Sequence, residues 1–203
     1  MIRYLLISAF FSLFISCKSY QVQDAVSVDN SLQFVQNQYF SDVSLDYVYK
    51  THIEIYGNKM GGIFIAKRIN DSIHRMVLTT DFGNKLLDFE VSESSFKVNF
   101  IIDNLDKKII INTLRDDFRT LLQVNSKVFK TYKRNNEVIY QTENNAYYYF
   151  DEVSSNLTKI IKTNKRKEKV IFTFNPKKTT FAENINIQHN NIKLKINFNQ
   201  INN

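Results

Sequence analysis

Apolar and polar side chains alternate with a period of two over most of this 203-residue chain, and this pattern constrains its fold more than any other feature. The alternation is clearest over residues 43–55, which predicts a long strand with one buried face. Asn-Asn pairs such as Asn135-Asn136 predict tight turns between later strands. The other predicted strands are 61–66, 73–79, 85–91, 96–101, 128–134, 138–141, 147–150, 160–163, 170–174, 182–188 and 192–198. The chain is therefore predicted to form an antiparallel meander.

Two segments have helical rather than strand-like spacing. Apolar residues recur at helical intervals over 105–122, which predicts a helix that interrupts the meander. Residues 109–111 would also suit a strand, with a helix starting later at a Thr113–Asp116 capping box, but we favour the longer helix. A second, short helix is predicted over 31–40, capped by Ser31.

The number of consecutive strands sets the fold class. The chain has one proline and four glycines, so few strands are interrupted. Long runs of antiparallel strands usually curl into a barrel. We therefore expect an α+β fold in which an incomplete antiparallel β-barrel of about 10–11 strands wraps around one or two helices. Residues 31–203 form a single domain in this interpretation, and the hydrophobic content of 43% is sufficient for a core without disulfides.

The N-terminus has the features of an export signal. Arg3 is followed by an apolar run, 4–15, that is too short to span a bilayer comfortably. The run ends in Leu13-Phe14-Ile15-Ser16-Cys17, which resembles the lipobox of bacterial lipoproteins. The resemblance implies a signal peptide over 1–16, cleavage before Cys17, and acyl chains such as palmitate on that residue. Residues 17–30 would then be a flexible tether, while the alternative is a free cysteine in an ordinary signal peptide.

The charge of the chain admits two interpretations. There are 27 Lys and Arg residues against 20 Asp and Glu, a formal net charge of +7. A basic exported domain could meet anionic lipid headgroups, but scattered surface lysines also serve solubility. The lysines are not gathered on one helix, so we expect no nucleic-acid partner.

Catalytic motifs are missing from the sequence. His52, His74 and His189 lie far apart, without partners at metal-ligand spacing, and Asp116-Asp117 is interpreted as a solvated helix face. We therefore expect no enzyme activity, no metal and no cofactor. In the run 147–149, alternation predicts that only the middle tyrosine is buried.

One hairpin is unusual because its tip is apolar. Thr80-Asp81-Phe82-Gly83 joins strands 73–79 and 85–91, and a large apolar residue at this tip buries nothing obvious within its own domain. Here the chain resembles the outer-membrane lipoprotein receptor LolB and its periplasmic partner LolA. The corresponding LolB loop, Asn-Pro-apolar-Gly, carries an exposed leucine where this chain has Phe82, and Asp81 stands in place of the proline. The order of strands and helix also agrees.

This resemblance implies a LolA/LolB-like half-barrel that binds acyl chains or lipoprotein clients and helps to insert them into the outer membrane. Phe82 and Lys85 would contact the membrane or an acyl chain. The residues expected to line a cavity are Tyr47, Phe89, Phe100, Leu114, Phe118 and Phe172. The alternative is that these side chains pack a dry core.

The expected location and partners follow from the anchor and the resemblance. The protein would be a monomer, lipid-anchored at the outer membrane through Cys17 and facing the periplasm. A periplasmic carrier protein would be a further partner. The competing hypothesis is a structural or assembly lipoprotein that uses the same fold as a protein-interaction module, with a filled core and an exposed sheet edge.

Overall fold

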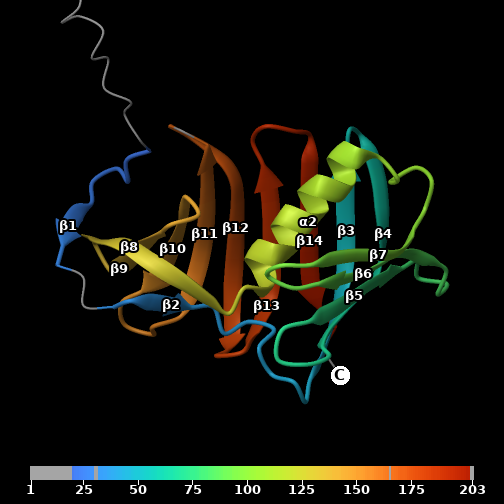
Figure 1. The fold of residues 1–203 in the computed structure, drawn as a ribbon, viewed down its shortest axis with the longest axis horizontal. Coiled ribbons are helices and arrows are strands. Elements are labelled where there is room, and N and C mark those ends of the chain that lie inside the picture. The colour runs from blue at the N-terminus through green and yellow to red at the C-terminus, as the bar shows by residue number, and fades with distance from the viewer. Residues whose placement is uncertain (1–19, 30–31, 165, 202–203) are drawn as a thin grey trace, which may run out of the picture.

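The computed structural model describes residues 20–29, 32–164 and 166–201, and it contains a single large antiparallel sheet and one helix in that part of the chain (Figure 1). The strands are β1 (Val26–Val28), β2 (Phe34–Gln36), β3 (Asp46–Ile55), β4 (Asn58–Arg68), β5 (His74–Thr79), β6 (Lys85–Val91), β7 (Phe96–Ile101), β8 (Asn125–Arg134), β9 (Glu137–Thr142), β10 (Ala146–Asp151), β11 (Leu157–Asn164), β12 (Lys167–Lys178), β13 (Phe181–His189) and β14 (Leu194–Gln200). Helix α2 (Lys108–Leu122) connects β7 to β8. All the strands predicted by alternation are present.

The sheet is open. Its strand order is β1-β8-β9-β10-β11-β12-β13-β14-β3-β4-β5-β6-β7, and β2 pairs separately with β8. The two halves of the chain join where β14 pairs with β3, with Leu194 opposite Ile55. The edges β1 and β7 do not pair with each other, so the barrel stays unclosed. The predicted α+β half-barrel is confirmed, with 14 strands rather than 10–11.

Helix α2 crosses the concave face of the sheet and supplies much of the core (Figure 1). Leu114, Phe118 and Leu121 are buried at helical spacing, while Ile109 is exposed. The predicted helix over 105–122 is confirmed, although it begins at Lys108. Leu105 lies in the turn before it and is also buried. The helix therefore packs its apolar stripe against the sheet.

The prediction of a short helix over 31–40 was wrong for the residues that the structure describes, 32–40. Residues 34–36 form β2, which pairs with β8, and a turn follows. Tertiary contacts outweigh the local spacing here. The Asn37 side chain donates to the Leu121 carbonyl at 2.9 Å, and the Tyr39 hydroxyl donates to the Leu157 carbonyl at 2.8 Å.

The segment expected as a tether also differs from its prediction where it can be seen. Residues 26–28 form β1 on the edge of β8, and Val22 is buried with Tyr147 and Tyr149 on the outer face of the sheet. The outer face of β9 to β12 is apolar at this point, and packing of this segment against it removes that apolar surface from water. The predicted signal peptide and Cys17 lie outside the described residues.

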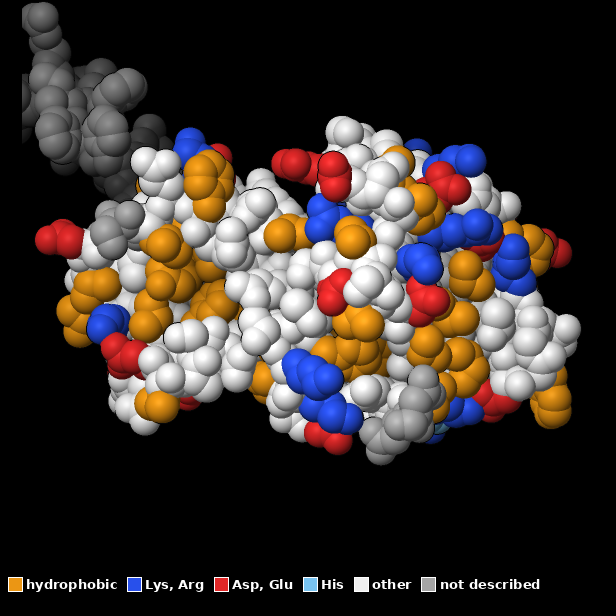
Figure 2. Space-filling view, turned by 90° about the horizontal axis from the view of Figure 1, so that it is seen from below, with side chains coloured by type: hydrophobic (Ala, Val, Ile, Leu, Met, Phe, Trp, Pro, Cys, Tyr) orange, Lys and Arg blue, Asp and Glu red, His pale blue; other side chains and the backbone are white. Residues whose placement is uncertain are grey.

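The surface has an apolar end. Hydrophobic side chains gather where β1, β2 and β8 meet (Figure 2), and Val26, Phe34 and Phe129 are more than half exposed there. None of the helices in the described ranges is long and apolar enough to cross a membrane.

Candidate functional site

The hairpin between β5 and β6 has a defined shape. The Thr80 amide donates to the Asn84 carbonyl at 2.8 Å, and the Gly83 amide donates to the Thr80 carbonyl at 3.0 Å. The Asn84 amide also donates to the Thr80 hydroxyl at 3.1 Å. Gly83 has φ +85°, a left-handed conformation that glycine adopts without strain. The tip is thus held by its own hydrogen bonds.

Phe82 projects from this tip into solvent. Phe82 is 94% exposed, the highest value among the large hydrophobic residues that the structure describes. Neighbouring Asp81 forms an ion pair with Lys50 of β3, which ties the base of the turn to the sheet. Leaving a phenylalanine in water forgoes about 1.5–3 kcal/mol of burial. The ring does not fold back to cap the barrel, so it is available to an external apolar phase.

Lys85 is already engaged by another residue. Its ammonium donates to Asp88 Oδ2 at 2.8 Å and lies 6.0 Å from the ring centroid of Phe100. The expected contact between Lys85 and a headgroup would have to compete with this ion pair. Phe82 is therefore the principal candidate at the hairpin.

Asp88 organises the outer surface of β5 to β7. Its carboxylate, which is almost fully buried, accepts two hydrogen bonds from Arg75, at 3.0 and 2.8 Å, and one from Lys85. The hydrogen bonds from Arg75 and Lys85 lower the pKa of Asp88 well below its ordinary range. The carboxylate therefore stays charged at all but very acidic pH.

This cluster makes a prediction about stability and pH. Because the folded-state pKa of Asp88 lies below its value of about 3.9 in an unfolded chain, its stabilisation is complete above about pH 5. It is lost as the pH falls through 3.9 toward the folded-state pKa. Asp88→Asn should cost about 1–2 kcal/mol at pH 7, measured by urea unfolding. If the free energies of unfolding of wild type and variant differed as much at pH 2.5 as at pH 7, this assignment would be contradicted.

The six residues expected to line a cavity instead lie in two places. Five of them are almost fully buried in the main core: Tyr47, Phe89, Leu114, Phe118 and Phe172. Phe100 is 42% exposed on edge strand β7. Phe118 stacks on Phe64 with ring centroids 5.9 Å apart. The five buried side chains fill the space between the helix and the sheet. They form a packed core, as in the alternative expectation.

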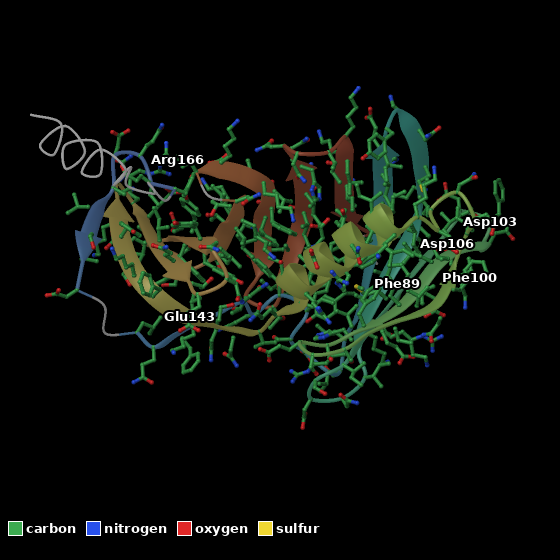
Figure 3. The ribbon with its side chains drawn as sticks, turned by 45° about the horizontal axis from the view of Figure 1, so that its top comes forward. Phe89, Phe100, Asp103, Asp106, Glu143 and Arg166 are labelled. Atoms are coloured by element: carbon green, nitrogen blue, oxygen red, sulfur yellow. The ribbon has the colours of Figure 1, made fainter. Side chains whose placement is uncertain are left out.

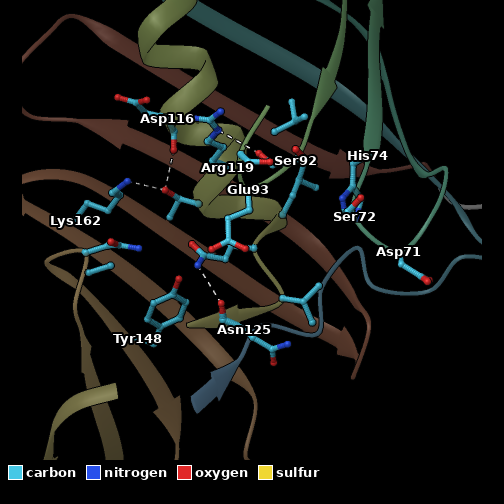
Figure 4. A pocket seen from close by; sticks show the side chains of 18 residues that line it. Asp71, Ser72, His74, Ser92, Glu93, Asp116, Arg119, Asn125, Tyr148 and Lys162 are labelled. Atoms are coloured by element: carbon cyan, nitrogen blue, oxygen red, sulfur yellow. Dashed lines mark hydrogen bonds between the residues drawn. The ribbon is translucent and has the colours of Figure 1, made fainter. Parts of the chain in front are cut away.

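A pocket in the described part of the chain lies elsewhere. It has a volume of about 520 Å³ and is bounded by the C-terminal half of α2, the β6–β7 turn, the start of β8, β10 and β11 (Figure 4). Lys162 donates to the Thr120 hydroxyl at 2.9 Å, and Arg119 donates to the Ser92 carbonyl at 3.2 Å. Burial lowers the pKa of Lys162. This mixed, charged wall differs from the apolar cavity that an acyl chain prefers.

A buried contact between His189 and Asp117 was not predicted from the sequence. His189 Nε2 lies 2.8 Å from Asp117 Oδ2, and both side chains are almost fully buried between β13 and α2. Burial raises the pKa of Asp117, although its hydrogen bond with His189 opposes this shift. The prediction of a solvated Asp116-Asp117 face was thus wrong for Asp117. The burial of Asp117 could have been predicted from its spacing, since it follows buried Leu114 by three residues on the same helix face.

The histidines show no metal-binding arrangement. Over residues 20–29, 32–164 and 166–201, no three His, Cys, Asp or Glu side chains are grouped to hold a metal ion. His74 Nε2 lies 3.0 Å from the Phe40 carbonyl, and burial lowers the pKa of this imidazole. His74 therefore has a structural partner within the core.

The described residues form an open antiparallel half-barrel around one helix, and this arrangement is the class of fold. No protein-family model and no curated protein matches the chain. One similar solved structure is a DUF1329 family protein from Desulfovibrio piger, with 6% identity, a TM-score of 0.43, and coverage of 77% of this chain and 84% of that chain. Another is a putative outer membrane lipoprotein-sorting protein domain from Vibrio parahaemolyticus, with 7% identity, a TM-score of 0.46, and coverage of 77% and 83%.

Proposed function

We propose that this protein is a membrane-anchored lipoprotein that inserts acyl chains or lipoprotein clients into the outer membrane. Cys17 carries the lipid anchor, and Phe82 makes the apolar contact. The observation that carries the proposal is the 94% exposure of Phe82 on a hydrogen-bonded hairpin tip. The role is one of binding and transfer rather than catalysis, with the protein facing the periplasm.

The filled core affects how a client would be held. Because the aromatic residues expected around a cavity pack against one another, an acyl chain would first meet the hairpin tip. A phenylalanine ring transferred from water into acyl chains gains about 1.5–3 kcal/mol, enough for a transient contact that can be released again. The tip would act as a wedge into the membrane or as a first contact for the client.

The test of this proposal is Phe82→Glu in a transfer assay with a lipid-modified client and outer-membrane vesicles. A charge at the tip should abolish transfer, because its desolvation opposes entry into the apolar phase. The melting temperature should stay within a degree or two of wild type, since the side chain is exposed.

Val153→Glu is the matched control, because Val153 is 84% exposed in the turn after β10. It should transfer clients normally. Normal transfer by Phe82→Glu, or a large loss of stability in that variant, would refute the role of the tip.

The second candidate function is a protein-interaction module. Its support is edge strand β7, which among the described strands pairs only with β6. Val98 and Phe100 are 38% and 42% exposed along it. An open edge can accept a strand from a partner protein. Normal transfer by Phe82→Glu would favour this function over the first.

A further inference from the structure

The first described residues are fastened to the outer face of the sheet. Tyr20 packs edge-on against Tyr147, with ring centroids 4.9 Å apart, and its hydroxyl donates to Glu168 at 2.7 Å. The Tyr147 hydroxyl in turn donates to the Tyr20 carbonyl at 3.3 Å. Val22 is buried in the same cluster. The chain is therefore held to the domain from Tyr20 onward.

This attachment limits how far the domain can lie from a lipid on Cys17. Three peptide units separate Cys17 from Tyr20, and a fully extended chain covers at most about 11 Å over that length. The step rests on the proposed function, because it needs Cys17 as the anchor. With that anchor, the face of the domain around Tyr20 lies at the headgroup layer of the membrane.

That face carries a basic pocket. It has a volume of about 400 Å³ and lies between residues 20–23 and the strands β8, β10, β11 and β12. Its charged lining consists of Arg134, Lys159, Arg166 and Glu168. Glu168 already accepts the hydrogen bond from Tyr20. Arg166 stands in the turn between β11 and β12, at the end of the molecule where the described chain begins (Figure 3). The lining therefore carries three cations and one carboxylate, and Arg134 is itself paired with Glu137.

Lys159 is the cation best placed to take an anion. Its ammonium lies 4.2 Å above the ring centroid of Tyr149 and 3.9 Å from Glu137 Oε1, which is beyond hydrogen-bond distance. Glu137 is bonded at 2.7 Å by Arg134. The Lys159 side chain is only 27% exposed. Within the described residues its three donors have no hydrogen-bonded acceptor, so an incoming phosphate oxygen would supply one.

We propose that this pocket binds the phosphate of an anionic phospholipid headgroup and so docks the domain onto the membrane that holds its anchor. Each basic residue near such a surface adds attraction that falls off with salt. Tyr20, which is partly exposed, suits the same place, because tyrosine combines an apolar ring with a polar tip at membrane interfaces. The docked pocket would hold the domain at one orientation.

The orientation has a consequence for Phe82. β1 and the hairpin joining β5 to β6 lie toward opposite ends of the longest axis (Figure 1). A docked orientation in which Phe82 also touches the bilayer therefore requires the long axis to lie along the membrane surface.

The test uses the full chain, purified with its own lipid and placed in nanodiscs of phosphatidylcholine, with or without phosphatidylglycerol. Amine labelling read by mass spectrometry reports the access to each lysine. Lys159 should label about fivefold more slowly when phosphatidylglycerol is present. Lys178, exposed at the far end of β12, should label equally in both. Arg166→Gln should weaken the protection of Lys159, and Lys178→Gln should leave it unchanged.

Each of three other outcomes refutes a particular part of the proposal. Equal labelling of Lys159 in both nanodiscs, with the protein still bound to them, refutes the docking alone. If glycerol phosphate added to phosphatidylcholine nanodiscs protects Lys159 equally well, the pocket is a site for soluble phosphate and not for the membrane. If wild type fails to float with lipid vesicles, or Cys17→Ser floats as well as wild type, the anchor is refuted and the docking with it.

Discussion

Phe118→Ala is expected to lower the free energy of unfolding by about 3–5 kcal/mol, because the ring is 2% exposed and truncation leaves a cavity that the core cannot close. The ring contacts Phe64 of β4 and Phe89 of β6, so its loss separates the helix from two strands of the sheet. For a domain of this size the melting temperature should fall by roughly 10 °C, measured by circular dichroism.

Ile109→Ala is the control on the same helix, because Ile109 is 55% exposed. It should change stability by about 0.5 kcal/mol or less. A shift of only a degree or two for Phe118→Ala would mean that α2 does not pack on the sheet as described.

Gly62→Ala is expected to destabilise the protein by about 3 kcal/mol or more. A Cβ atom at Gly62 would lie 1.7 Å from the Thr79 carbonyl oxygen, which belongs to the backbone and cannot rotate away. Thr79 ends β5 directly before the Phe82 hairpin, so the clash would push the base of that hairpin out of place. Thermal unfolding measures the loss.

The neighbouring Gly61 provides the control. A Cβ there would lie 3.2 Å from the Thr51 carbonyl oxygen, which requires a shift of only a few tenths of an ångström. Gly61→Ala should therefore be far milder than Gly62→Ala. Equal stabilities for the two variants would show that β4 and β5 do not approach as closely as described.

The strands and the main helix could be predicted because their signal is local. Alternation over β3 and helical spacing over α2 both reflect one buried face, which a sequence displays directly. The exposed tip at Phe82 could also be predicted, because the loop of five residues between β5 and β6 is too short to cover an apolar side chain. Gly61 and Gly62 both lie within β4, where close backbone approach requires glycine at position 62.

The remaining features depend on contacts between distant parts of the chain. Tyr147 and Tyr149 were expected to be exposed, but residues 20–25 cover them on the outer face. The basic pocket likewise combines that segment with β8 and the β11–β12 turn. No local pattern shows that a polar N-terminal stretch will lie on a strand more than a hundred residues later.

The central claim is that Phe82 enters an apolar phase, and its most direct test uses the lack of tryptophan in this chain. Phe82→Trp places a single fluorescent indole at the tip, and Val153→Trp places one in another exposed turn. With vesicles containing brominated acyl chains, the account predicts a blue shift and quenching for Phe82→Trp and neither for Val153→Trp. An unchanged emission spectrum from Phe82→Trp in the presence of the vesicles would contradict it.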